Sequence, residues 1–239
     1  MTLMRLAGMQ PYFFPYLGYF DLIYNVDKWI FFDTPQYIKN GWVNRNRILH
    51  PHQGWQYIIV PIQKQPLDTP INQVLIHEGS NWKQLILRQL FHYHKPAPYY
   101  RQTLELIEDC FQIEEPYLSR LNLHILRRVC RFLEIPFNCC VFSEADIKIG
   151  LVEKSGDWAL RICQAFGATT LINPPGGRDL YDPVEFRANG IELVIREFPS
   201  MNYSTGPYTF EPNLSIIDVL MWNAPEQIRA YLDQVKLPG

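Results

Sequence analysis

The chain has 239 residues, of which 47% are apolar and 19% charged, enough to bury a sizeable core in one large α/β domain or two small ones. The formal net charge of −2 argues against a general nucleic-acid binder, because such proteins normally carry a basic surplus. No apolar run approaches the roughly 20 residues of a membrane helix, and the five cysteines form no CxxC pair. We therefore expect a cytoplasmic protein with reduced thiols, no nucleic-acid partner and no membrane insertion.

The N-terminal segment predicts a strand, a helix and a second strand. Residues 3–9 form an apolar run that Gln10-Pro11 ends, because proline cannot continue a central sheet ladder. Apolar side chains then repeat at helical spacing over residues 16–24. Residues 28–33 are apolar without alternation, which is typical of a strand covered on both faces. This order predicts a parallel βαβ unit.

The rest of the chain alternates helices and strands after a helical interruption. The further predicted strands are residues 55–62, 137–142, 169–172 and 191–198. The further predicted helices are residues 82–91, 102–113, 117–134, 155–166 with Ser155 as N-cap, 182–190, and two after Ser215. We expect one α/β domain over residues 1–239, with a doubly wound, mostly parallel, Rossmann-like sheet and a helical insert at about residues 80–134.

Polar residues follow several of these strands, where open parallel sheets bind ligands. Gln10 and Tyr12 follow the first strand, and Asp33 and Gln36 follow the second. Gly176-Gly177-Arg178 comes after the strand at 169–172. We expect these groups to line one pocket for a small-molecule substrate, with Asp33 as the candidate catalytic base or hydroxyl-binding group.

Residues 10–19 are dense in aromatic side chains and contain two prolines that stiffen the loop. Tyr16 and Tyr19 form a Tyr-x-Gly-Tyr unit where Rossmann-like nucleotidyltransferases carry His-x-Gly-His, at a helix start suited to an anion. Phenols donate hydrogen bonds but carry no positive charge at neutral pH, so the unit favours ligand positioning over nucleotidyl transfer. The alternative is an aromatic segment of the core.

Residues 36–48 alternate two asparagines, Asn44 and Asn46, with two arginines, Arg45 and Arg47. In an extended segment the arginines share one face and the asparagines the other. A basic face of this kind is suited to a diphosphate or a carboxylate, so Asn44 and Arg45 are candidate binding residues. The alternative is that the arginines pair with acids elsewhere in the chain.

The turn at Gly176-Gly177 offers backbone N–H groups beside the Arg178 guanidinium, a combination that suits an anion, although an ordinary loop has the same composition. The sequence contains no G-x-S-x-G, Walker A, G-x-G-x-x-G or H-E-x-x-H motif. His92 and His94 fall at a predicted helix end, where residues two apart diverge, so we expect no metal site. The sequence indicates neither a cofactor nor an oligomeric state.

Residues 9–21, Met-Gln-Pro-Tyr-Phe-Phe-Pro-Tyr-Leu-Gly-Tyr-Phe-Asp, closely resemble the opening signature of the WbqC-like protein family. The resemblance continues through residues 33–48, with their Asp, Gln and Asn-Arg-Asn-Arg-Ile run. It also includes the Gly-Gly turn and Tyr of 173–181 and the Leu-Ser-Ile-x-Asp segment at 214–218. It extends from residue 9 to about residue 230. Asn173-Pro174-Pro175 departs from it, because the family usually has a Ser-Gly pair before the glycines.

The resemblance implies a role in the assembly of bacterial surface polysaccharides, notably O-antigen. On this basis we expect an enzyme, in its most specific version a transferase that acts on a nucleotide-linked amino sugar. Two alternatives stay open. One is a non-catalytic assembly protein that binds a glycan or a partner, and the other is a Rossmann-like nucleotidyltransferase relative.

Overall fold

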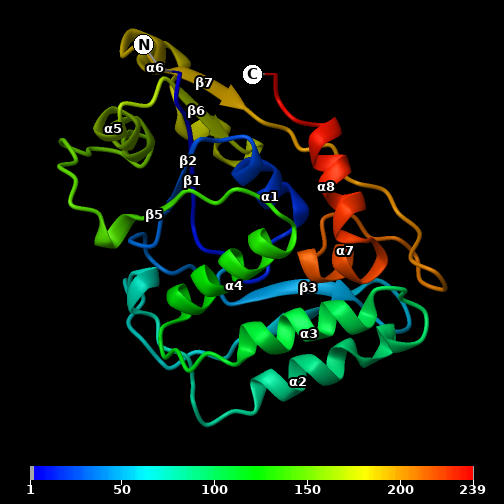
Figure 1. Ribbon diagram of the computed structural model, residues 1–239. Helices are drawn as coiled ribbons and strands as arrows, with labels where there is room; N and C mark the ends of the chain where they lie inside the picture. Colours follow the sequence, from blue (N-terminus) through cyan, green and yellow to red (C-terminus); the bar gives the residue numbers. More distant parts are fainter. Residues whose placement is uncertain (1–2, 239) are drawn as a thin grey trace.

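The computed structural model describes residues 3–238 and contains a five-stranded parallel sheet (Figure 1). The strands lie in the order β5-β2-β1-β6-β7, and every neighbouring pair is parallel. Their bounds are β1 Arg5–Met9, β2 Lys28–Phe31, β5 Cys139–Val141, β6 Thr170–Asn173 and β7 Glu192–Ile195. The chain adds β2 and β5 on one side of β1, then β6 and β7 on the other. The strand order therefore reverses between β1 and β6.

Helices cover both faces of this sheet because side chains alternate across each strand. Leu6 and Ile30 join one buried apolar cluster with residues of α5 and α6. Ala7 and Trp29 join a larger cluster with residues of α1, α4 and α8. The helix bounds are α1 Leu17–Tyr24, α4 Leu118–Phe132, α5 Asp157–Phe166, α6 Pro183–Ala188 and α8 Pro225–Gln234. Burial on both faces explains the continuous apolar strand sequences.

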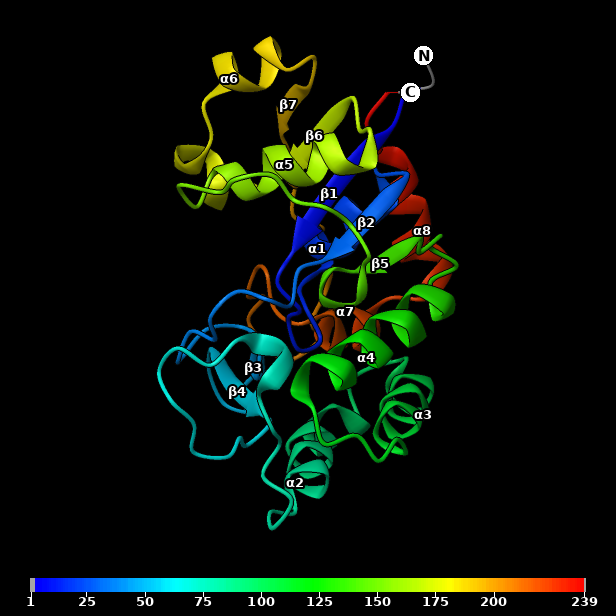
Figure 2. The ribbon, with the colours of Figure 1, turned by 90° about the vertical axis from the view of Figure 1, so that its left-hand side faces the viewer.

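A hairpin and further helices form the other end of the molecule. In Figure 2, β3, β4, α2 and α3 lie at the opposite end from α5 and α6. The elements are β3 Arg45–Leu49, β4 Trp55–Ile59, α2 Trp82–Gln89, α3 Tyr100–Phe111 and α7 Ile216–Trp222. The described chain also contains four 3₁₀ segments. Two lie within this end, η1 Ile71–Gln73 and η2 Leu90–His94, and two follow strands of the sheet, η3 Phe142–Glu144 and η4 Pro175–Leu180. Buried residues of this end belong to the larger apolar cluster, so the two ends share one continuous core.

The expectation of an α/β chain with a parallel sheet flanked by helices is confirmed. The segment between β2 and β5 is longer than the predicted insert at about 80–134, because it also contains the antiparallel β3–β4 hairpin. Ser215 is the predicted N-cap of α7 and accepts the N–H of Ile217 at 3.2 Å. The N-cap predicted for α5 is wrong. Gly156 occupies that position, and the carboxylate of Asp157 accepts two backbone N–H groups of the preceding turn.

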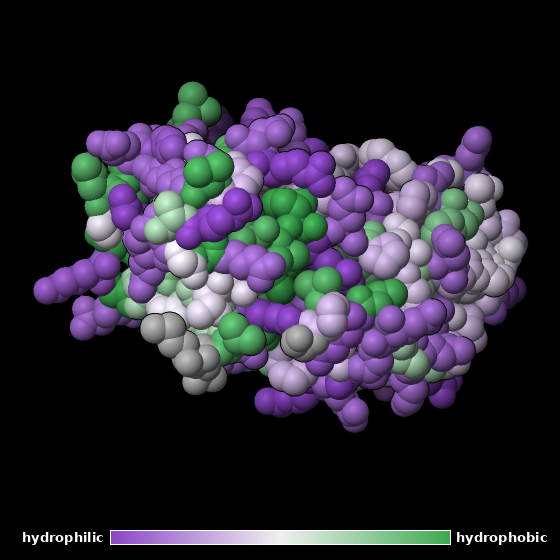
Figure 3. All heavy atoms as spheres, turned by 90° about the horizontal axis from the view of Figure 1, so that it is seen from above, coloured by the Kyte–Doolittle hydropathy of each residue, from purple (hydrophilic) through white to green (hydrophobic). Residues whose placement is uncertain are grey.

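The surface is largely polar with scattered apolar side chains. Seen from above, apolar side chains gather near the centre of a mainly polar face (Figure 3). Single exposed apolar residues such as Leu67 and Val184 are normal for a folded protein. Within residues 3–238, no helix combines the length and apolarity that a membrane span requires.

A buried ion pair ties α1 to the segment that follows β7. Nε and Nη2 of Arg196 lie 2.9 and 3.0 Å from the two carboxylate oxygens of Asp21. Asp21 is fully buried, and Nδ2 of Asn25 also donates to it at 3.1 Å. Such a bidentate geometry is the strongest form of an arginine–carboxylate contact. Because α1 directly follows the aromatic loop, the pair helps to fix that loop against the sheet.

Replacing Asp21 by Ala leaves the Arg196 guanidinium without its counter-charge in a largely buried position. We expect the free energy of unfolding to fall by roughly 3–5 kcal/mol, measured by urea denaturation. Arg178→Ala is the matched control, because Arg178 and Glu197 form an exposed pair, with side chains 58% and 72% accessible. That change should alter stability by less than about 1 kcal/mol. Equal effects of the two substitutions would contradict the importance given to the buried pair.

Candidate functional site

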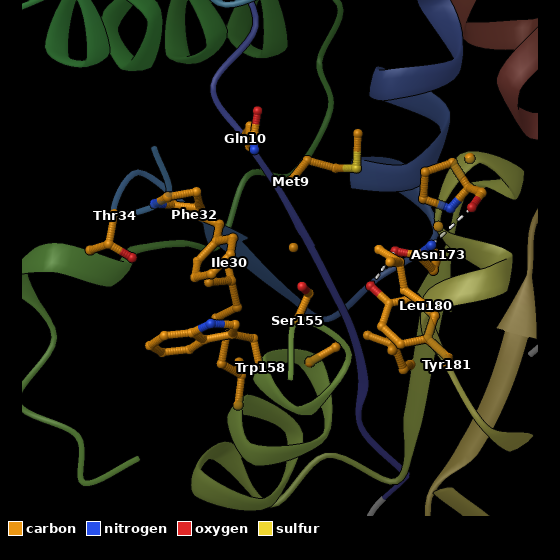
Figure 4. A pocket seen from close by; sticks show the side chains of 18 of the residues that line it. Met9, Gln10, Ile30, Phe32, Thr34, Ser155, Trp158, Asn173, Leu180 and Tyr181 are labelled. Carbon is orange, nitrogen blue, oxygen red and sulfur yellow. Dashed lines mark hydrogen bonds between the residues drawn. The ribbon is translucent and has the colours of Figure 1, made fainter. Parts of the chain in front are cut away.

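A cavity of about 1200 Å³ opens at the carboxyl ends of β1, β2 and β6 (Figure 4). Met9 and Gln10 reach it from β1, and Phe32 and Thr34 from the end of β2. Asn173 and the turn behind it close the side of β6, and the segment that leads into α5 forms the opposite wall. The cavity therefore lies where the strand order reverses, which is the position at which open α/β sheets bind ligands.

The loop after β1 contributes three of the predicted site residues, Gln10, Tyr12 and Tyr16, to the cavity wall. Tyr19 is not among the lining residues. It is fully buried, and its hydroxyl donates to the backbone carbonyl of Gln10 at 3.0 Å. A Cβ on Gly18 would collide with the ring of Tyr16, so this glycine lets the ring fold over the start of α1. Within the Tyr-x-Gly-Tyr unit, Tyr16 thus lines the cavity, whereas Tyr19 supports the backbone of the loop at Gln10.

The turn after β6 contributes Gly176 and Gly177, as the sequence led us to expect. Nδ2 of Asn173 donates to the carbonyl of Pro174 at 2.8 Å, and the hydroxyl of Tyr181 donates to Oδ1 of Asn173 at 3.4 Å. A Cβ on Gly177 would overlap this amide, whereas a Cβ on Gly176 would meet nothing within 4 Å. The two glycines therefore have different roles. Gly177 makes room for Asn173, and Gly176 leaves the cavity wall open.

Arg178 and Gln36, also predicted as binding residues, point their polar groups elsewhere. Arg178 donates to Oε1 of Glu197 at 3.0 Å, and both side chains are exposed. Gln36 is exposed and donates to the carbonyl of Leu67 at 2.6 Å. Neither residue lines the cavity, so the expectation that they share it with Gln10 is wrong in geometry. The Gly-Gly turn can be predicted from the sequence, but the direction in which the long Arg178 side chain extends from it cannot.

Asn44 and Arg45 belong to the hairpin and not to the cavity wall. The Asn44 amide accepts from the hydroxyl of Tyr37 at 2.8 Å and donates to a backbone carbonyl at 2.9 Å, so it is a buried structural link. The guanidinium of Arg45 stacks 4.2 Å from the ring centroid of Tyr57 and donates to Asn40. The predicted clamp therefore does not form at Arg45.

Asp33, the predicted base, is buried just beyond β2 and accepts two hydrogen bonds from Ser143, 2.6 Å from its hydroxyl and 3.0 Å from its backbone N–H. Burial raises the pKa of Asp33, and the bonds from Ser143 act in the opposite direction. Its neighbours in sequence line the cavity, but Asp33 does not. Its geometry is that of a carboxylate that joins the end of β2 to the end of β5, and a catalytic role stays a prediction.

The sequence reasoning missed the wall formed by residues 152–159. Glu153, Lys154 and Ser155 reach the cavity from the turn before α5, and Trp158 reaches it from the first turn of the helix. Glu153 and Lys154 are the charged members of the described cavity wall. Nζ of Lys154 lies 3.3 Å from Glu185, whose carboxylate raises the pKa of the lysine. The place of α5 in the chain could have predicted this wall, because a helix that packs on a parallel sheet begins at the carboxyl edge of the strands.

Asp218 is another buried carboxylate, and it does not line the main cavity. It accepts hydrogen bonds from the hydroxyls of Tyr93 at 2.6 Å and Tyr203 at 2.7 Å. Burial raises the pKa of Asp218 to about 6, although both tyrosine bonds lower it. The carboxylate joins α7 to η2 and to the irregular segment at residues 199–213, so its role is to hold three segments together. Within residues 3–238, no group of three His, Cys, Asp or Glu side chains is placed to hold a metal ion.

The chain belongs to the WbqC-like protein family, whose model matches residues 10–230. The resemblance carried by the aromatic loop and the later motifs is therefore confirmed. The chain is also similar to Rv1507c, an uncharacterized protein of Mycobacterium tuberculosis, with 30% identity over 232 residues that cover 94% of this chain and 97% of the relative. No solved structure matches the chain.

Gly177→Ala should displace the Asn173 amide and loosen the turn after β6, because the new Cβ would overlap that side chain. We expect a loss of about 1–3 kcal/mol in the free energy of unfolding from this overpacking. Gly176→Ala is the matched control, since its Cβ meets no atom within 4 Å. Chemical denaturation of both variants tests the difference, and equal stabilities would show that the turn tolerates a side chain at either position.

The unfolding free energy should depend on pH through Asp218. Its folded pKa of about 6 lies above the ordinary value near 4, so between these values the folded state binds the proton and the unfolded state does not. This contribution to stability is complete below about pH 4 and is lost as the pH rises towards 6, a change of roughly 3 kcal/mol. Asp218→Asn should remove that part of the profile in urea denaturation. Parallel profiles for the two proteins would contradict the raised pKa.

Proposed function

We propose that this protein is a transferase that binds a nucleotide-linked amino sugar in the main cavity and acts in the biosynthesis of bacterial surface polysaccharides of the O-antigen type. The observation that carries the proposal is the position and lining of the cavity. It lies between β1 and β6, and its wall combines aromatic rings, glycines and a few polar groups. Binding sites for small molecules are typically apolar clefts with a small number of such polar groups.

We read the strand order β5-β2-β1-β6-β7 as a doubly wound, Rossmann-like arrangement. In such sheets a nucleotide lies across the reversal point, with its phosphates near a helix N-terminus. Here the turn before α5 provides that end, and its backbone N–H groups lie at the cavity wall beside the Lys154 ammonium, which is paired with Glu185. At about 1200 Å³ the cavity exceeds the roughly 300–1,000 Å³ typical of ligand sites, which leaves room for both halves of a nucleotide sugar.

The lining side chains indicate which parts of the cavity would contact which parts of the ligand. Trp158 and Tyr181 present aromatic surface, which stacks on a nucleobase or on the apolar face of a sugar. Gln10, Tyr12, Tyr16, Gly176 and Gly177 would contact the substrate. Glu153 is the carboxylate of the cavity wall and the candidate general base for an amine of the sugar. Glu153 would take a proton from that amine, which makes the amine a nucleophile. The five free cysteines suit a cytoplasmic protein.

Two alternatives are less well supported. A nucleotidyltransferase relative would use both tyrosines of the Tyr-x-Gly-Tyr unit on phosphate, but the Tyr19 hydroxyl is buried and bonded to Gln10. A non-catalytic assembly protein would need a surface for a glycan or a partner, whereas the main feature of this chain is a large cleft with a carboxylate in its wall. Turnover separates the first proposal from simple binding, because a binder saturates without consuming its ligand.

Titration calorimetry with UDP-glucosamine and dTDP-glucose tests the proposal. We expect saturable binding that Trp158→Ala weakens by about tenfold, because an aromatic stacking contact contributes on the order of 1–3 kcal/mol. Phe91→Ala is the control, since Phe91 is 65% exposed and does not line the cavity. Thermal melting of both variants separates lost binding from lost folding. Absence of binding by both nucleotide sugars to the unaltered protein would overturn the proposal.

A further inference from the structure

A smaller cavity of about 230 Å³ adjoins the main one, and we call it the side chamber. It is lined by Tyr12, Tyr16, Trp42, Asn46, Arg47 and Asn213. Tyr12, Tyr16 and Trp42 also line the main cavity, so these three aromatic side chains form the boundary between the two spaces. The side chamber is smaller than the roughly 300–1,000 Å³ of typical ligand sites, which excludes a nucleotide but admits a small molecule or one end of a larger one.

Arg47 supplies positive charge to the side chamber without an acidic partner. Its guanidinium carbon lies 5.3 Å from the ring centroid of Trp42 and 5.0 Å from that of Trp55, so two indoles flank it. Its one hydrogen bond from the guanidinium within residues 3–238 is a long one, 3.4 Å, to the carbonyl of Asn213. Nε is buried and has no acceptor in the described part of the chain. A buried donor of this kind is destabilising until an acceptor reaches it.

The remaining polar groups of the side chamber are also donors or are already satisfied. The Asn46 amide donates to the carbonyls of Phe13 and Phe14 and accepts the N–H of Arg47, so it is occupied. The hydroxyls of Tyr12 and Tyr16 make no hydrogen bond to any residue of the described chain, 3–238. Burial raises the pKa of both phenols, which therefore stay protonated donors at neutral pH. With no acidic side chain in its wall, the chamber suits an oxyanion.

We propose that the side chamber binds the carboxylate of a second, small substrate, next to the nucleotide sugar of the main cavity. Arg47 favours an oxyanion as the ligand, and the three aromatic side chains of the wall favour a planar carboxylate over a tetrahedral phosphate. Two indole centroids lie within 5.3 Å of the Arg47 guanidinium carbon, and its buried Nε has no acceptor within residues 3–238, so donors are left for a ligand. The N–H groups of a planar guanidinium point along its edge and match a carboxylate bidentately. The inference rests on the proposed function for the identity of the neighbouring ligand, but the carboxylate site is independent of it.

The test is calorimetric titration of the whole protein with acetate, with inorganic phosphate and with UDP-glucosamine at low salt. We expect saturable acetate binding that Arg47→Gln weakens at least tenfold. Arg47→Lys keeps the charge but loses the planar fork, so it should retain part of the affinity. Arg45→Gln is the matched control, because Arg45 lies on the same strand but stacks on Tyr57 outside both cavities. UDP-glucosamine should bind Arg47→Gln as it binds the unaltered protein.

The outcomes separate this inference from the proposed function. Absence of acetate binding, or equal weakening by Arg47→Gln and Arg45→Gln, would overturn the side chamber as a carboxylate site. Stronger binding of phosphate than of acetate, or loss of UDP-glucosamine binding in Arg47→Gln, would assign the chamber to phosphate and also overturn it. Acetate binding without UDP-glucosamine binding would leave the side chamber in place and remove the proposed nucleotide-sugar site. UDP-glucosamine binding without acetate binding would leave the proposed nucleotide-sugar site in place and remove the side chamber as a carboxylate site.

Discussion

Both cavities depend on the hydrogen bonds that hold the aromatic loop after β1. Three buried side chains donate hydrogen bonds to backbone carbonyls of the loop. Asn122 of α4 donates to Pro11, Asn46 of β3 to Phe13 and Phe14, and Ser215 at the start of α7 to Phe14. The loop belongs to no sheet ladder of the described chain, so no backbone N–H of a neighbouring strand donates to its carbonyls, and its prolines have no N–H group to offer. The three side chains therefore satisfy carbonyls that would otherwise be buried without a partner. They also stabilise Phe14 in the left-handed region, at φ 39°. A change in any of the three donors therefore acts on the loop.

The loop is fixed from three distant parts of the chain, and this has a consequence for binding. Tyr12 and Tyr16 are carried by backbone that is already ordered, so a ligand does not have to order it. The family motifs contain much of this scaffold. Asn46 lies in the Asn-Arg-Asn-Arg run and Ser215 in the Leu-Ser-Ile segment, and Asp21 closes the opening signature. The signature that identifies the family thus includes residues that build the cavity walls from behind, as well as residues that face a ligand.

This explains which parts of the site could be predicted from the sequence. Strands and the loops at the carboxyl edge are local signals, so the sequence predicts that Gln10 and Gly177 share one edge, and both line the cavity. The alternation of the hairpin was also local, and it gave the two arginines of β3 a common face. Which arginine meets a cavity depends on the aromatic side chain beside it, Tyr57 for Arg45 and the two indoles for Arg47. The packing of the folded chain brings each aromatic side chain beside its arginine, and the spacing of residues in the sequence does not predict that packing.

The charges of the two cavities also differ in a way that fits two ligands. Lys154 is exposed and lies near two carboxylates, those of Glu185 and Asp157, so it adds little net charge to the main cavity. Selection there must rely on shape, stacking and backbone N–H groups. Arg47 is already held between two rings and has no carboxylate beside it, so it loses little side-chain entropy when an anion arrives. The tyrosines of the boundary donate to neither side in the free protein. Their hydroxyls are therefore free to bond a ligand in either cavity.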